Sequence, residues 1–191
     1  MEAPLFVIVS GAPGSGKTTL ATQLAAHMRL LHVPRDEFFW GMTYTANAHI
    51  NRGAEGINTF YDVLRSLGEK GVSLVTDGTI YKGISEPDIT GKLAPIARLV
   101  NVHCRAENVN QRFYNREVAR YGQATDELEE HLKHLDKIYA DTAEPLQLDC
   151  PVLEVDTNGI YNPSLAEIAE WIGDRNSELS KRAAYRGKRT Q

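Results

Sequence analysis

The chain has 191 residues, of which 42% are hydrophobic and 24% charged, as expected for one soluble globular domain rather than two. No apolar run reaches the roughly 18 residues of a membrane span and no basic segment precedes the first apolar run, so we expect no transmembrane helix, no signal peptide and a cytoplasmic location. The formal net charge is −4, but residues 174–191 carry six lysines and arginines against two acids, which leaves −8 on residues 1–173. An acidic body argues against tight, non-specific binding of duplex nucleic acid.

A glycine-rich loop joins the first predicted strand to the first predicted helix. Residues 5–9 form a short apolar run typical of a buried strand, and apolar residues recur at helical spacing from Leu20 to Met28. Between them, residues 11–18 match the P-loop pattern G-x-x-x-x-G-K-[ST]. The predicted nucleotide-binding residues are Gly11, Ala12, Pro13, Gly14, Ser15, Gly16, Lys17, Thr18 and Thr19.

Each part of this loop suits a nucleoside triphosphate. Glycines let backbone N–H groups turn inward around a phosphate, and the helix N-terminus adds partial positive charge. Lys17 is expected to reach the β- and γ-phosphates, and the Thr18 hydroxyl is expected to ligate Mg²⁺. ATP and Mg²⁺ are therefore the predicted cofactors.

Residues 30–34 predict a second strand, followed at its carboxyl end by Asp36. Ligands of open parallel sheets bind outside the carboxyl ends of strands, so Asp36 is a candidate general base for an attacking hydroxyl. The alternative is a helix cap or a surface ion pair with Arg35. Residues 38–55 predict either a long functional loop or a helix that periodicity does not reveal.

A third strand is predicted at 72–76, after an amphipathic helix at 57–67. Asp77 closes this strand, where a Walker-B-type carboxylate would orient Mg²⁺; the alternative is an Asp that caps a loop. Residues 85–97 include a further predicted helix.

A fourth strand is predicted at 98–104, before a polar helix at 107–120. Arg112, Arg116 and Arg120 are spaced four residues apart and so share one helix face. Arginines there would cover the charge of a transferring phosphoryl group; the alternative is a solvated face paired with nearby acids. A second helix follows Thr125, a plausible N-cap.

The last elements are a fifth strand at 151–155 and a helix that opens at Asn162-Pro163 and ends at Gly173. Strands alternating with helices predict an α/β fold, a doubly wound five-stranded parallel sheet of the P-loop NTPase type with a helical lid. We expect one domain in residues 1–173 and a basic tail in 174–191 that is solvated or disordered, or that contacts phosphates.

Two other residue pairs have simple interpretations. Cys104 and Cys150 each end a predicted strand, which favours buried free thiols in a reducing compartment. His131 and His134 share a helix face and either ligate a metal or are surface histidines; no third ligand is evident nearby.

Four stretches, residues 11–19, 34–37, 72–79 and 103–120, together resemble the polynucleotide-kinase-like branch of small P-loop kinases, and similar small-molecule kinases such as chloramphenicol phosphotransferase. The resemblance implies that Asp36 is the general base. It also implies that the lid arginines are Arg112 and Arg116.

The chain departs from the polynucleotide kinases at Phe39, which stands where phage enzymes carry an arginine that holds a substrate phosphate. This favours an acceptor contacted by aromatic surface, including a nucleoside stacked on Trp40. The adenine of ATP is expected near the lid and the turn at 156–159.

The sequence therefore favours an ATP-dependent phosphotransferase acting on a hydroxyl of a small molecule or nucleoside. One alternative is a polynucleotide 5′-hydroxyl kinase, with nucleic acid as partner at its 5′-OH end or on the basic tail; another is a non-catalytic nucleotide-binding switch or assembly module. No Asn-Lys-x-Asp stretch supports a GTPase. The expected catalytic residues are Asp36, Lys17, Arg112 and Arg116, and the expected metal ligands are Thr18 and Asp77.

Overall fold

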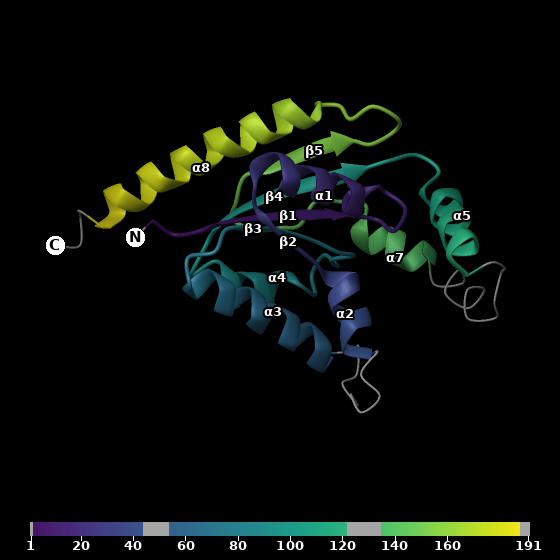
Figure 1. Cartoon of the computed structure of the whole chain (residues 1–191), viewed down its shortest axis with the longest axis horizontal. Coiled ribbons are helices and arrows are strands. Elements are labelled where there is room, and N and C mark those ends of the chain that lie inside the picture. Colours follow the sequence, from purple (N-terminus) through teal and green to yellow (C-terminus); the bar gives the residue numbers. More distant parts are fainter. Residues whose placement is uncertain (1, 44–53, 122–134, 188–191) are drawn as a thin grey trace.

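A five-stranded parallel sheet forms the centre of the molecule (Figure 1). The computed structural model describes residues 2–43, 54–121 and 135–187. The strand order β2-β3-β1-β4-β5 confirms the predicted doubly wound α/β sheet. The strands are β1 (Leu5–Gly11), β2 (Leu31–Pro34), β3 (Leu74–Asp77), β4 (Arg98–Arg105) and β5 (Val152–Asp156).

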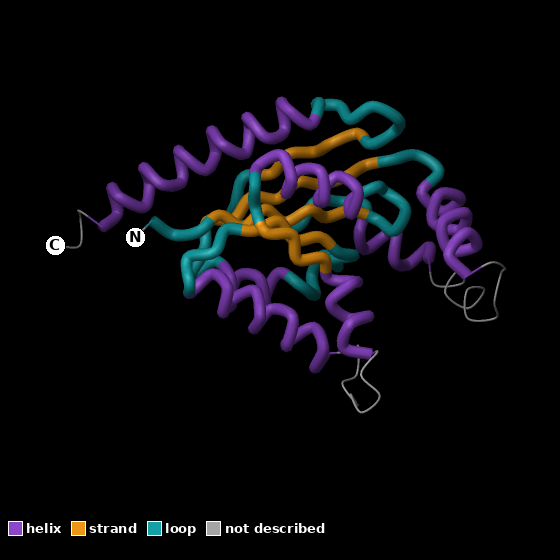
Figure 2. Tube along the Cα trace, in the orientation of Figure 1, coloured by secondary structure: helices purple, strands orange, loops and turns teal. Residues whose placement is uncertain are grey.

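Helices cover both faces of the sheet, as parallel strands require for their crossovers (Figures 1 and 2). One face carries α1 (Lys17–Met28) and α8 (Leu165–Gly187). The other carries α3 (Ala54–Glu69), α4 (Glu86–Asp88) and the π-helical turn η1 (Ile89–Leu93).

β1 is buried along its whole length, and its side chains alternate between two apolar cores. Leu5, Val7 and Val9 pack with α1 and α8, whereas Phe6 and Ile8 pack with α3 and η1. Because both faces are covered, the strand needs an apolar residue at every one of these positions. The loop that follows β1 is therefore anchored on both sides.

Three further helices lie at the carboxyl edge of the sheet. α2 (Arg35–Thr43) follows β2, α5 (Val109–Tyr121) follows β4, and α7 (Leu135–Thr142) precedes β5. α5 and α7 lie beyond the sheet edge and share a small apolar cluster of Phe113, with Ile138 and Tyr139 packed against it (Figure 1). This pair forms the predicted helical lid.

The last helix corrects one prediction. α8 does not end at Gly173 but continues to Gly187, because Leu179 packs against the core shared with α1. An interior glycine costs a helix only about 1 kcal/mol, which this packing offsets. The division into a domain at 1–173 and a tail at 174–191 stays a prediction.

The cysteines are free, and burial raises the pKa of Cys104 to about 12 and that of Cys150 to about 11. Both thiols are thus protonated at neutral pH; Cys104 is buried as predicted, whereas Cys150 is only partly buried. The helix cap at Thr125 and the pair His131 and His134 lie outside the described residues. Within the described parts of the chain, no helix combines the length and apolarity that crossing a membrane needs.

Candidate active site

The loop between β1 and α1 has the backbone of a phosphate cradle. Gly14 and Gly16 have φ angles of 82° and 79°, which residues with a Cβ rarely adopt. A Cβ on Gly14 would also lie 2.2 Å from the carbonyl oxygen of Val109, so glycine is required there for space as well. Lys17 begins α1, is 4% exposed, and donates a hydrogen bond to the carbonyl of Ala12 at 3.3 Å.

Lys17 is a buried cation within reach of several other predicted site residues. Burial lowers the pKa of its ammonium group, the negative charges of Asp36 and Asp77 oppose that shift, and the positive charge of Arg116 adds to it. The charges of Asp36 on α2, Asp77 on β3 and Arg116 on α5 thus all act on Lys17 of α1. A phosphate oxygen would supply the close anionic partner that a buried ammonium favours.

Asp77 connects the loop to β2. It ends β3, is 3% exposed, and accepts a hydrogen bond from the Thr18 hydroxyl at 2.6 Å on one carboxylate oxygen. The other oxygen accepts a hydrogen bond from the His32 imidazole at 2.8 Å. The sequence analysis did not identify His32, and the only signal for it is a polar residue within a short predicted strand.

Asp36 lies exposed in the first turn of α2, at the carboxyl end of β2. Its neighbour Arg35 is buried instead: its guanidinium donates to the carbonyl of Thr79 at 2.5 Å and lies over the ring of Phe39. These contacts argue against the alternative of an Arg35–Asp36 ion pair. The carboxylate of Asp36 acts electrostatically on Lys17.

Arg112 lies directly at the P-loop. One nitrogen of its guanidinium is among the nearest atoms to a Cβ built on Gly16, at 3.6 Å. The guanidinium also donates to the carbonyl of Thr157 at 3.4 and 3.5 Å. It therefore stands between the phosphate cradle and the turn at 156–159, where the adenine is expected.

Arg116 lies one helical turn further along α5. Its guanidinium pairs with Glu117 at 2.7 Å and lies 5.1 Å from the ring centroid of Phe113. The Arg116 side chain is about half exposed, so this ion pair contributes little to stability. The side chain of Arg120 is outside the described part of the structure.

Thr157 is a second residue that sequence reasoning left without a specific role. It is 2% exposed, and its hydroxyl lies within hydrogen-bond distance of the carbonyls of Ser15, at 2.5 Å, and Arg105, at 3.0 Å. The turn after β5 is thereby attached to the P-loop and to the end of β4.

Both lid helices contact the P-loop at their bases. The start of α5 packs on Gly14, and the Tyr139 hydroxyl of α7 donates to the carbonyl of Pro13 at 3.3 Å. The P-loop is therefore in contact with both helices.

A buried polar network connects β1 to the segment after α7. The His103 ring donates to the carbonyl of Ala143 at 3.1 Å, so its other nitrogen, Nδ1, accepts from the Ser10 hydroxyl at 3.0 Å. Asn101 donates to the same hydroxyl at 2.9 Å. Burial lowers the pKa of His103, which favours the neutral imidazole that this pattern needs.

The residues present fit a triphosphate with Mg²⁺. The Ser15 hydroxyl is buried in the loop with no hydrogen-bond partner among the described residues, as expected of a donor whose partner is a ligand. Thr18 and Asp77 supply the hydroxyl and carboxylate oxygens that Mg²⁺ prefers, 2.6 Å apart. Both groups stand at the N-terminus of α1, where phosphates bind.

Comparison with known proteins agrees with this geometry. The family described as AAA domain matches residues 6–141, which is more than half of the chain. No curated protein matches the sequence.

Solved structures share the fold at low sequence identity. A protein of Chloroflexus aurantiacus described as a candidate kinase superposes with a TM-score of 0.71 at 23% identity, covering 93% of this chain and 98% of the other. The APS kinase of Mycobacterium tuberculosis, solved with AMPPNP and APS, has a TM-score of 0.60 at 17% identity and covers 92% and 98%. A sugar kinase of Janibacter has a TM-score of 0.55 at 19% identity and covers 90% and 91%.

Proposed function

Because the chain belongs to the AAA domain family and places Asp36 and Asp77 within electrostatic reach of a buried Lys17, we propose that it is an ATP-dependent phosphotransferase. The acceptor is a hydroxyl group of a small molecule or nucleoside. The observation that carries the proposal is this group of charges at the carboxyl edge of the sheet. The phosphate cradle alone is compatible with a nucleotide switch, whereas a second carboxylate beside it supplies the general base that transfer to a hydroxyl needs.

Each residue has a defined part in the transfer. The acceptor oxygen forms a bond to the γ-phosphorus as the bond from that phosphorus to the β,γ-bridging oxygen breaks. Asp36 takes the proton of the acceptor hydroxyl, and Lys17 holds the β- and γ-phosphates. Arg112 and Arg116 neutralise the equatorial oxygens. Mg²⁺, held through Thr18 and Asp77, would neutralise further phosphate charge.

The solved structures with this fold support a kinase over a switch. The three proteins reported above are described as a candidate kinase, an APS kinase and a sugar kinase. The acceptors differ among such proteins, so the family leaves the acceptor of this chain open.

A small acceptor also fits the position of the basic C-terminal segment better than a nucleic-acid end does. Ser180 of α8 contacts Arg98, which begins β4. The contact therefore lies at the amino ends of the strands, whereas the P-loop follows the carboxyl end of β1. The tail thus leaves the fold on the far side of the proposed active site. A phosphate-binding arm for a 5′-OH end would be expected at the near side.

Asp36→Asn tests the proposal. Asparagine keeps the size of the side chain but takes up no proton, so turnover should fall by about 10²–10⁴-fold. ATP affinity, measured by calorimetry, should change by less than about 1 kcal/mol, because Asp36 is exposed and its proposed contact is with the acceptor hydroxyl rather than with the phosphates. Glu37→Gln, an exposed acid beside it, is the matched control and should leave both quantities unchanged.

Two results would contradict the assignment. Full turnover by Asp36→Asn would make the residue a cap rather than a base. If the wild-type protein binds ATP but phosphorylates none of a panel of sugars, nucleosides and 5′-OH oligonucleotides, the chain is a nucleotide-binding module instead.

A further inference from the structure

Arg35 is a buried cation at the carboxyl edge of the sheet. It is 7% exposed and begins α2, directly before the proposed base Asp36. Its guanidinium forms no ion pair with an acid in the described parts of the chain. Residues 44–53, which follow α2 in the sequence, contain no aspartate or glutamate. Because burying a charge without an opposite charge costs free energy, a buried arginine of this kind needs a compensating partner.

The contacts of Arg35 hold its side chain in place without neutralising it. The stem packs on Gly78, where a Cβ would lie 2.9 Å from both Cβ and Cδ of Arg35, so glycine allows this close approach. One terminal nitrogen donates to the carbonyl of Thr79 at 2.5 Å, and the guanidinium lies 5.2 Å from the centroid of the Phe39 ring. The Nε–H group is buried and has no hydrogen-bond partner among the residues that the structure describes. A buried donor without a protein partner points to a ligand or an ordered water.

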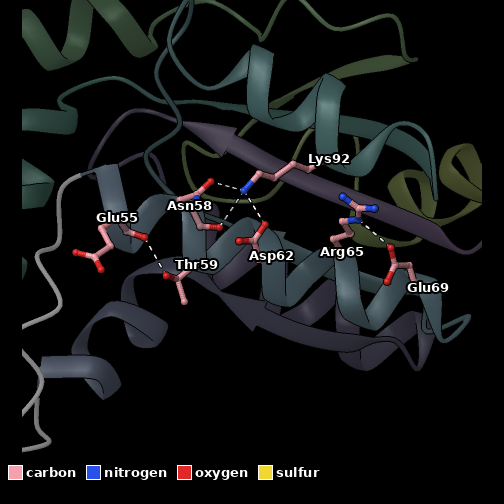
Figure 3. A network of polar contacts seen from close by, with 7 residues as sticks. All are labelled: Glu55, Asn58, Thr59, Asp62, Arg65, Glu69 and Lys92. Carbon is pink, nitrogen blue, oxygen red and sulfur yellow. Dashed lines mark hydrogen bonds and ion pairs between the residues drawn. The ribbon is translucent and has the colours of Figure 1, made fainter.

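Two cations on the α3 side of the molecule are paired with acids instead. Lys92 reaches from η1 to α3, where its ammonium pairs with Asp62 at 2.6 Å (Figure 3). Arg65 pairs with Glu69 at 2.8 Å one helical turn along α3. A cation that already has a carboxylate partner gains little from an anionic ligand. Arg35, which is more deeply buried and unpaired, has the most to gain.

The acids around Arg35 act on it only from a distance. The hydroxyls of Tyr61 and Tyr81 feel the positive charge of Arg35 together with the negative charges of four acids, which are Asp36, Glu86, Asp88 and Asp141. None of these four forms an ion pair with the guanidinium. Lys82, the residue after Tyr81, adds a positive charge to the same segment. A ligand oxygen at hydrogen-bond distance from the guanidinium would feel that charge more strongly than the more distant acids.

We propose that Arg35 binds an oxyanion of the acceptor, either a carboxylate or a phosphate ester, and so selects an acidic hydroxyl compound. This inference rests on the proposed phosphotransferase function and names its substrate class. Consecutive residues of a helix do not face each other, so Arg35 and Asp36 contact different parts of one molecule. The anionic group is held by Arg35 while a separate hydroxyl meets Asp36. The planar guanidinium offers paired N–H donors that match the oxygens of a carboxylate or phosphate.

Matched compounds that differ in charge test this selection. Glucitol, gluconate and glucitol 6-phosphate form one set; glycerol, glycerate and glycerol 3-phosphate form a second. Binding to the wild-type protein saturated with AMPPNP and Mg²⁺ is measured by calorimetry at neutral pH, and turnover with ATP is measured separately. In at least one set, an anionic compound should bind at least about 30-fold more tightly than the neutral alcohol. The tighter of the carboxylate and the phosphate identifies the oxyanion.

Two variants of Arg35 assign the preference to its guanidinium. Arg35→Gln keeps a donor for the carbonyl of Thr79 but removes the charge, and Arg35→Met keeps an unbranched stem to pack on Gly78. Each should bind the three compounds of a set with equal affinity. Arg65→Gln, at an exposed position of α3, changes the net charge by the same amount and should keep the wild-type order (Figure 3). Circular dichroism and AMPPNP affinity show whether each variant is folded.

A measurement on the wild-type protein tests the contact itself. The Nε–H signal of Arg35 in the NMR spectrum of the AMPPNP complex should shift when the preferred anion is added and stay in place with the neutral alcohol. If neither variant folds, this signal decides, and an unshifted signal would overturn the inference.

The outcomes separate this inference from the proposed function. Anion-selective binding that depends on Arg35 but is not followed by turnover would support the oxyanion site and contradict the kinase assignment. Turnover of a neutral alcohol at the same KM as its anionic counterparts, or a lower one, would support the kinase and overturn the inference. A preference that survives both variants, an equal loss of affinity for all three compounds, or no binding by either set would also overturn it.

Discussion

Replacing His32 with alanine removes one of the two hydrogen bonds that orient the Asp77 carboxylate. The lost hydrogen bond is 2.8 Å long and its acceptor is a buried carboxylate. A hydrogen bond to a charged group contributes about 1.5–3 kcal/mol of free energy, equivalent to roughly 10–150-fold in an equilibrium constant. Mutation of a residue that hydrogen-bonds to a metal ligand typically lowers metal affinity or activity by about 10–100-fold. We expect the Mg²⁺ concentration for half-maximal turnover to rise by that factor.

The assay for His32→Ala is an Mg²⁺ titration of ATP turnover, with calorimetry of Mg²⁺ binding to the AMPPNP complex as a second measurement. His27→Ala, an exposed histidine on α1, is the matched control. His32→Gln keeps a side-chain donor and should recover part of the loss. A change of less than twofold in His32→Ala, or an equal change in the control, would refute the reasoning that His32 positions Asp77.

Four other changes have defined outcomes. Lys17→Ala should lower turnover by about 10²–10³-fold in a protein that remains folded by circular dichroism, because the phosphates lose a buried cation; near-normal turnover would contradict the kinase assignment. Arg116→Ala should lower kcat more than it raises KM for ATP in steady-state kinetics, because the charge it meets grows in the transition state; a change in KM alone would make it a binding residue. Burial lowers the pKa of His103 below its ordinary 6.5, so the unfolded chain binds a proton first as pH falls; stability in urea should therefore decrease below about pH 6.5, and His103→Gln should flatten that slope, whereas parallel curves would exclude His103 as the cause. Deletion of residues 178–191 should lower the free energy of unfolding by about 1 kcal/mol or more, because Leu179 leaves the core, while turnover of a small acceptor stays nearly unchanged; a selective, salt-dependent loss on oligonucleotide ends would show a nucleic-acid arm instead.

The parts of the site that the sequence predicts are those set by local pattern and by the rule for parallel sheets. The loop from Gly11 to Thr18 is a contiguous motif, so its place after a buried strand follows directly. Asp36 and Asp77 follow two different strands, and the carboxyl ends of parallel strands share one edge. Their common environment with Lys17 is the consequence of that rule.

The residues that the sequence did not predict act through contacts between distant segments. His32 reaches Asp77 only because β2 pairs with β3. No sequence motif in either strand predicts that the two strands are neighbours. Thr157 contacts Ser15 across 142 positions of the chain. The end of α8 was wrongly predicted for the same reason, since Gly173 is a local stop signal and Leu179 is held by tertiary packing.

The two ends of the described chain lie close together, which determines where a fusion partner, tag or linker can be joined. Glu2 contacts Ser180 near the end of α8, and Figure 1 shows both segments at the side of the sheet away from α5 and α7. A fusion partner, an affinity tag or a surface linker joined at this side would leave the P-loop edge facing outward. The same adjacency would let a short linker join the two ends directly, so that the chain could be reopened elsewhere on its surface as a circular permutant.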